Sequence, residues 1–249
     1  MKYRDTLYHN YSTHFGAKQD LPDELHFAMF DKVYPPRPRV AGAVLDLACG
    51  RGAWLRWMAA RGAKDVAGVD WSQFDLDAVN LPGATLTRGD IFEFLRKGTD
   101  LFSVIHGKDI IEHMTKDEVV EFLSLCRDRL VPAGSLWIST FNALAPMAAQ
   151  TWRGDFTHEM AFTPGSMKQV MHACGFPEVE ILCCHPVPPT LNGWMRLWLN
   201  KPVALICEFV TRLRYGSSGD LNCLPSLLAF GKTPDRPGDS EKASVPKSS

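Results

Sequence analysis

The chain has 249 residues, of which 45% are hydrophobic and 22% are charged. This composition indicates a globular protein with one large domain, and it excludes a collagen, a coiled coil, a disordered chain and a disulfide-stabilised mini-protein. The 27 basic residues are balanced by 28 acidic ones, for a formal net charge of -1, so we expect no nucleic-acid partner. Seven cysteines and a start without an apolar core predict reduced thiols and a cytoplasmic location.

Short apolar runs alternate with segments of helical character between residues 40 and 184. Strands that alternate with helices predict an α/β fold, with a parallel sheet covered on both faces. One helix start is well defined, because Thr115 and Glu118 have the spacing of a capping box. That helix should end before Pro132, and a strand around 136–140 should follow the turn.

A glycine turn at residues 48–52 is the most informative stretch. The segment V-L-D-L-A-C-G-R-G predicts a strand that runs into this turn, and A-W-L-R-W-M-A-A-R-G after it predicts a helix. Glycines at such a turn permit positive φ and let a ligand approach the backbone closely. The next strand ends at Asp70, 20 residues after Gly50, where a carboxylate can accept both hydroxyls of a ribose.

Two nucleoside cofactors, a dinucleotide such as NAD and S-adenosylmethionine, fit this pattern, and two residues distinguish between them. A dinucleotide fingerprint needs a third glycine three residues after the second, where this chain has Leu55. Asp46, just before the turn, would repel a phosphate and suit a cationic ligand. S-adenosylmethionine (SAM) combines a ribose with an ammonium and a sulfonium, so SAM is favoured over NAD.

These residues resemble the first motif of the class I SAM-dependent methyltransferases, V-L-D-L-G-C-G-x-G, with Ala48 in place of the first glycine. We expect this departure to cost little. The resemblance covers about residues 40–185 and implies a Rossmann-like, seven-stranded, mostly parallel sheet with an antiparallel last strand and a helical cap. It places Asp70 on the ribose and Asp90 on the adenine. The full set of implied cofactor residues is Asp46, Ala48, Gly50, Gly52, Asp70, Trp71, Asp90, Ile91, Phe92 and His106.

A base for the acceptor is expected just after the fourth strand. Methyl transfer is an in-line displacement, and a hydroxyl acceptor must also lose a proton. His113 is the candidate general base, because imidazole titrates near neutral pH. The alternative is a structural histidine bonded to backbone near the following helix cap.

A metal site is a second alternative at the same place. Asp109, Glu112 and His113 have the i, i+3, i+4 spacing that would put three ligands on one helical face. The spacing resembles the E-x-x-E-H pattern of quinone-biosynthesis O-methyltransferases that bind a divalent ion, with Asp109 in place of the first Glu. The prediction made here is a metal-free base.

A second polar cluster, residues 153–159, follows the fifth strand and adds Asp155 and His158 as catalytic candidates. Loops at the carboxyl ends of parallel strands bind substrate in α/β sheets, although this loop could instead be held by its own hydrogen bonds. The run D-F-T-H-E followed by A-F-T-P resembles methyltransferases encoded with bacterial surface-polysaccharide enzymes. It favours O-methylation of a small-molecule or glycan hydroxyl in polysaccharide biosynthesis. The alternatives are a metal-dependent quinone or phenol O-methyltransferase, a non-catalytic SAM-binding protein and an NAD-dependent enzyme.

The domain organisation predicted from these patterns has five parts. They are an N-terminal lid segment at 1–36 with Tyr11 and His14 facing the site, a catalytic core at 37–185, an apolar helical insertion at 186–221, a final strand at 222–231 and a disordered tail at 232–249. The insertion carries tryptophans and four basic residues, and Pro202 interrupts it. Its apolar run is too short to span a bilayer. We favour a cap on the domain or a homodimer contact, and peripheral membrane contact near a lipid-linked substrate is the alternative.

Overall fold

The structure is a computed structural model that describes residues 21–34, 42–187, 189–216 and 221–234. The predicted lid residues Tyr11 and His14 and nearly all of the predicted tail therefore lie outside the described residues.

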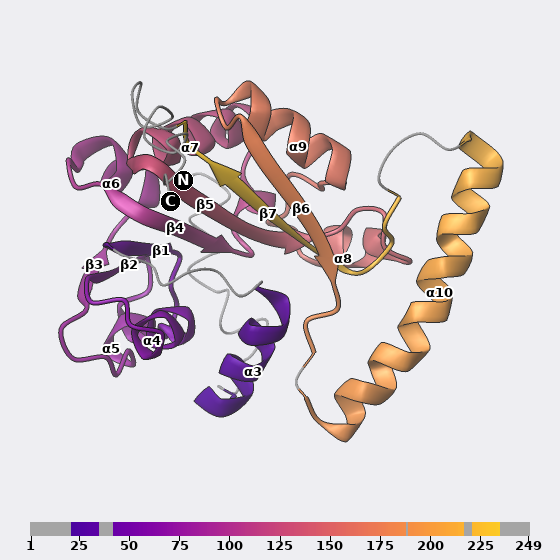
Figure 1. Ribbon diagram of the computed structural model, residues 1–249, viewed down its shortest axis with the longest axis horizontal. Helices are drawn as coiled ribbons and strands as arrows, with labels where there is room; N and C mark the ends of the chain where they lie inside the picture. Colours follow the sequence, from indigo (N-terminus) through magenta and orange to yellow (C-terminus); the bar gives the residue numbers. More distant parts are fainter. Residues whose placement is uncertain (1–20, 35–41, 188, 217–220, 235–249) are drawn as a thin grey trace, which may run out of the picture.

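Seven strands form one sheet in the order β3-β2-β1-β4-β5-β7-β6 (Figure 1). The strands β1 to β5 pair in parallel, whereas β7 runs antiparallel to both of its neighbours. This confirms the predicted Rossmann-like sheet with an antiparallel last strand. The strand bounds are β1 Val44–Leu47, β2 Val66–Asp70, β3 Thr85–Arg88, β4 Phe102–Lys108, β5 Leu130–Phe141, β6 Glu178–Cys184 and β7 Ser226–Lys232.

Helices cover both faces of the sheet, with α6, α7 and α9 on one side and α3, α4 and α5 on the other (Figure 1). The helix bounds are α3 Asp23–Val33, α4 Ala53–Ala60, α5 Gln73–Asp77, α6 Ile91–Lys97, α7 Lys116–Asp128, α8 Ala148–Gly154, α9 Pro164–Ala173 and α10 Leu191–Tyr215, with a 3₁₀ turn η1 at Ile111–His113.

The sheet divides the core into two apolar clusters. Successive side chains of a strand point to opposite faces, so Leu136 and Ile138 of β5 pack with α7 and α9. Trp137, between them, packs with α3 and α4 on the other face. The central strands β1, β4 and β5 are buried on both sides over most of their length, which explains their nearly continuous apolar runs.

Capping residues set the starts of two helices, and the first is the start predicted at Thr115. Thr115 and Glu118 form a complete capping box at α7, and Thr163 and Ser166 form another at α9. The strand β5 differs from the prediction, because it already begins at Leu130. The predicted turn at 132–134 lies inside β5, where the pairing register with β4 shifts.

The insertion forms a single helix, α10, which continues through Pro202. Its expected role, a cap on the domain or a homodimer contact, stays a prediction. Of its apolar side chains that the structure describes, Ala204 alone is buried, and most of the long ones are exposed. Within the described parts of the chain, no helix is both long and apolar enough to cross a membrane.

Candidate active site

The glycine turn after β1 has the predicted left-handed backbone. Gly50 has φ 51° and Gly52 has φ 73°. A Cβ on Gly52 would lie 2.8 Å from Val79, whereas a Cβ on Gly50 would meet nothing within 4 Å. Gly52 is therefore required by packing, and Gly50 leaves open space at the carboxyl end of β1, as the close approach of a ligand needs.

Ala48 lies in the left-handed region as well, with φ 58°. An L-residue in this conformation is strained by roughly 1–2 kcal/mol. The expectation that alanine costs little at this motif position is therefore wrong, because the backbone here needs what glycine provides.

Asp70 ties the end of β2 to the glycine turn. Its two carboxylate oxygens accept the Gly50 and Ser72 backbone N–H groups, each at 2.8 Å. Burial raises the pKa of Asp70, and these two amide bonds oppose the rise. Each oxygen keeps a second lone pair, so the carboxylate can also accept a hydroxyl beside the space that Gly50 leaves.

Asp46 is held by a buried chain of hydrogen bonds. Tyr34 Oη donates to His106 Nε2 at 2.7 Å, and His106 Nδ1 donates to Asp46 Oδ1 at 2.6 Å. The indole of Trp54 stacks on the His106 ring at 4.3 Å with the planes 2° apart. Both nitrogens of His106 have protein partners, so we assign His106 to positioning Asp46 rather than to contact with a cofactor. Nothing in the sequence spacing indicated this role.

The other predicted cofactor residues follow the ends of β2 and β3. Trp71 is exposed directly after Asp70. Asp90 is exposed and caps α6 by accepting the Glu93 N–H at 2.9 Å. Phe92 packs edge-on against Phe122 of α7, and Ile91 is partly buried against the core of that face. The exposed carboxylate and indole lie at the edge where parallel α/β sheets bind ligands.

Glu112 is a buried carboxyl on η1, and Thr140 Oγ1 donates to it at 2.9 Å. Burial raises the pKa of Glu112 to about 8, and the nearby charge of Asp109 adds to the rise. The side chain is therefore largely protonated at neutral pH.

His113 is connected to Asp155 through Thr157. Thr157 Oγ1 lies 2.6 Å from Asp155 Oδ1 and 2.8 Å from His113 Nδ1. A carboxylate only accepts, so the threonine hydroxyl donates to Asp155 and accepts a hydrogen bond from Nδ1–H of His113. This assigns the tautomer in which Nε2 of His113 carries a lone pair. Burial, and then the neighbouring His158, lower the pKa of His113 to about 4, so the ring is neutral at pH 7.

His158 completes the group. Its ring lies 4.7 Å from that of His113 and 5.6 Å from that of Phe141. Its Nδ1 donates to the Thr151 carbonyl at 3.1 Å, and Nε2 lies 4.0 Å from Asp155. The two polar clusters predicted separately, after β4 and after β5, therefore form one site.

Backbone bonds hold the two clusters together. The Glu159 and Met160 N–H groups both donate to the Glu112 carbonyl, at 2.8 and 2.9 Å. The segment 155–160 is thus fixed to η1 and is not held by its own hydrogen bonds alone.

The predicted helical face of Asp109, Glu112 and His113 does not form. Asp109 follows β4 with φ 52° and pairs with Lys108, and η1 begins only at Ile111. Ligand atoms of Glu112, His113 and His158 instead lie within 4.8 Å of one another. The alternative metal set considered from the sequence therefore differs from this group in one member. No spacing rule indicated His158, which lies 45 residues beyond His113.

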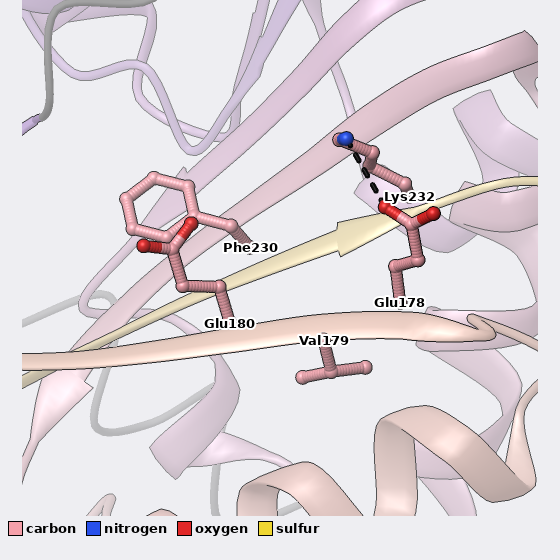
Figure 2. Close-up of a pocket in the computed structure, with 5 residues that line it drawn as sticks. All are labelled: Glu178, Val179, Glu180, Phe230 and Lys232. Carbon is pink, nitrogen blue, oxygen red and sulfur yellow. Dashed lines mark hydrogen bonds and ion pairs between the residues drawn. The ribbon is translucent and has the colours of Figure 1, made fainter.

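A depression of about 340 Å³ lies elsewhere, over β6 and β7 (Figure 2). Glu178 and Glu180 line it together with Phe230 and Lys232, and Lys232 is ion-paired with Glu178 at 3.1 Å. Glu178 is the first residue of β6, which runs in the same direction as β5, so this hollow is at the amino edge of the sheet, opposite the glycine turn. Charges on the edge strand β6 hinder pairing with another chain, and we assign no ligand there.

Comparison with known proteins gives one family and one fold. The methyltransferase domain family matches residues 15–181. A SAM dependent methyltransferase from Archaeoglobus fulgidus has a similar structure, with a TM-score of 0.64 and 20% identity over 91% of this chain and 99% of that chain. A SAM-dependent methyltransferase from Mesorhizobium loti has a TM-score of 0.55 and 20% identity over 79% of this chain and 93% of that one.

Phosphoethanolamine N-methyltransferase 2 of Haemonchus contortus, in complex with SAM, has a TM-score of 0.57 and 17% identity over 95% of this chain and 58% of that one. No curated protein sequence matches this chain. The family match confirms the predicted class I SAM-dependent methyltransferase and its cofactor, so the NAD alternative is dropped. The chain belongs to the methyltransferase domain family.

Proposed function

We propose that this enzyme methylates a hydroxyl oxygen of a small molecule or glycan, with His113 as the general base. The observation that carries the proposal is the chain from His113 through Thr157 to Asp155, which sets the imidazole tautomer and directs the Nε2 lone pair to accept a proton. The strand β4 that leads to His113 pairs with β1, so the base follows a strand end beside the glycine turn.

The cofactor residues fit a sulfonium nucleoside. Asp46 and Asp70 place carboxylates at the ends of neighbouring strands, and Gly50 leaves room between the turn and a ligand. When bound, SAM supplies a methyl group activated by a positively charged sulfur. Asp70 would then accept ribose hydroxyls and Asp90 the adenine amine, while Asp46 would face the cationic part.

The low pKa of His113 is compatible with its proposed role. A hydroxyl becomes strongly acidic as its oxygen is methylated, so a weak base suffices to take the proton. The buried Asp155, acting through Thr157, stabilises the imidazolium that results. His158, whose ring lies 4.7 Å from that of His113, would contact the acceptor and adjust its position.

A metal-assisted version of the same reaction is the second candidate, because Glu112, His113 and His158 converge. A divalent ion there would displace the proton of Glu112 and orient a phenol or catechol oxygen. Under that alternative, chelator treatment abolishes turnover and added Mg²⁺ or Zn²⁺ restores it. Turnover that chelators leave unchanged supports the metal-free base.

The test uses methyl-labelled SAM with panels of sugars, phenols and amines. Once an accepted hydroxyl compound is found, His113→Ala should keep SAM affinity and lose about 10²-fold to 10⁴-fold in rate. His172→Ala, an exposed histidine on α9, is the matched control and should retain full activity. Label found only on amines, or unchanged turnover by His113→Ala, contradicts the proposal, and SAM binding without any transfer by the wild type supports a non-catalytic protein.

A further inference from the structure

The helix α10 presents a long apolar stripe away from the domain. In Figure 1 it stands apart from the sheet as the outermost helix on the side of β6 and α8. Leu191 is 85% exposed, Trp198 74% and Phe209 61%. Other members of this stripe are Met195, Leu199, Val203, Leu205, Ile206, Val210 and Leu213. Trp194, at one border of the stripe, is half-exposed and has the Lys32 ammonium of α3 5.1 Å from its ring centre. Contiguous apolar surface of this kind marks a contact with another apolar phase.

The stripe follows the helical repeat. Its members recur every three or four residues from Leu191 to Leu213, so they lie on one face of the helix. The opposite face is turned to the domain: Ala204 is buried, and Glu208 accepts the Cys223 N–H at 3.0 Å. The single acidic residue of α10 is therefore on the inner face.

Basic side chains border the stripe on both sides. Arg196 and Arg214 are 18 residues apart, about five turns, and lie along one border. Lys201 and Arg212 are 11 residues apart, about three turns, and lie along the other. All four are exposed. The outer half of α10 thus combines an apolar centre with cations on each flank.

We propose that α10 docks in the surface of an anionic lipid bilayer, with the stripe at the boundary of the acyl chains and the four cations at the head groups. Tryptophan and phenylalanine suit that boundary, and basic side chains are attracted to anionic lipid. A second copy of the chain fits less well, because a symmetric pair of α10 helices would bring only like charges to its borders. Docking would let the enzyme work on an acceptor carried by an amphiphile.

The test measures binding of the full chain to sedimented vesicles of phosphatidylcholine alone and of phosphatidylcholine mixed with phosphatidylserine. We expect binding to the mixed vesicles that weakens as salt is raised. Each basic residue at an anionic surface strengthens binding by about fivefold, so the double variant Arg212→Gln, Arg214→Gln should weaken it by about 25-fold. The double variant Trp198→Glu, Phe209→Glu should abolish binding to the mixed vesicles.

Controls separate docking from misfolding and from catalysis. Leu101→Glu changes an exposed apolar residue outside α10 and should leave vesicle binding unchanged. SAM affinity and the melting temperature report folding of every variant, and neither depends on the identity of the acceptor. Equal binding by the Trp198→Glu, Phe209→Glu variant and the wild type, or no binding of wild type to anionic vesicles, overturns the proposal. A dimer in sedimentation equilibrium that this variant dissociates assigns the stripe to a contact between copies and also overturns it.

Discussion

Gly50→Ala separates the folding role of the glycine turn from its cofactor role. The backbone at Gly50 has φ 51°, which an alanine adopts at roughly 1–2 kcal/mol, and the added Cβ meets nothing within 4 Å. Glycine's greater loss of entropy on folding offsets about 0.5–1 kcal/mol of that strain. The N–H that Asp70 accepts is retained. The net loss of stability should therefore be about 1 kcal/mol, or roughly 2–4 °C in Tm.

The same Cβ projects into the space left for the cofactor. An extra carbon at a close contact typically destabilises it by about 1–3 kcal/mol, which corresponds to roughly a fivefold to 150-fold loss of SAM affinity. Gly83→Ala is the matched control, since Gly83 also has positive φ, at 84°, and open space, but precedes β3 at the other edge of the sheet.

Calorimetric titration with SAM and thermal melting of both variants make the comparison. Both should lose comparable stability, and only Gly50→Ala should lose affinity. Equal affinities of Gly50→Ala and wild type would refute the placement of the cofactor at this turn.

Three further predictions follow from the strained and titrating groups. Ala48→Gly relieves the left-handed strain and should raise Tm by about 1–3 °C, measured by calorimetry. If His113 is the base, kcat/KM should fall at low pH with a midpoint near 4, because its pKa is lowered to about 4. The pKa of Glu112 is raised from 4.5 to about 8, so its stabilising contribution is complete below pH 4.5 and is lost as pH rises through 8. The stability of Glu112→Gln relative to wild type should therefore increase as the pH is raised from about 5 to about 9. Thermal melting of both proteins at each pH measures this difference.

Each of these predictions has a contradicting result. A lower Tm for Ala48→Gly would mean that the alanine methyl contributes packing that outweighs the strain. An acid limb of kcat/KM near pH 6.5 would assign the proton transfer to a group other than His113. Parallel curves of stability against pH for wild type and Glu112→Gln would show that the Glu112 carboxyl is charged in the folded protein. Glu24→Gln, at an exposed position on α3, is the control for that comparison.

The sheet and the cofactor turn were predictable because their signals are local. The alternation of apolar runs and helices, the capping boxes and the glycine turn each lie within a short stretch of sequence. Asp70 was found by its distance from Gly50 along the chain, and the structure joins them by a hydrogen bond. Parallel topology then brings the strand ends together at one edge.

The acceptor site was predictable only in pieces. His113 and His158 were proposed from two separate clusters, and their convergence depends on the backbone bonds between 159–160 and Glu112. Neither Thr157 as the link to Asp155 nor His106 as the support of Asp46 has a spacing signature. The exposure of α10 was not predictable either, because an apolar helix predicts an apolar contact but does not say whether the domain, a second copy or a lipid surface provides it.

The central claim is that the turn after β1 holds a sulfonium nucleoside and not a dinucleotide. Calorimetric titration of the wild-type protein with S-adenosylhomocysteine and, separately, with NADH tests it most directly. The account predicts saturable binding of S-adenosylhomocysteine and no heat with NADH. Saturable heat with NADH and none with S-adenosylhomocysteine, on protein that melts cooperatively, would contradict it.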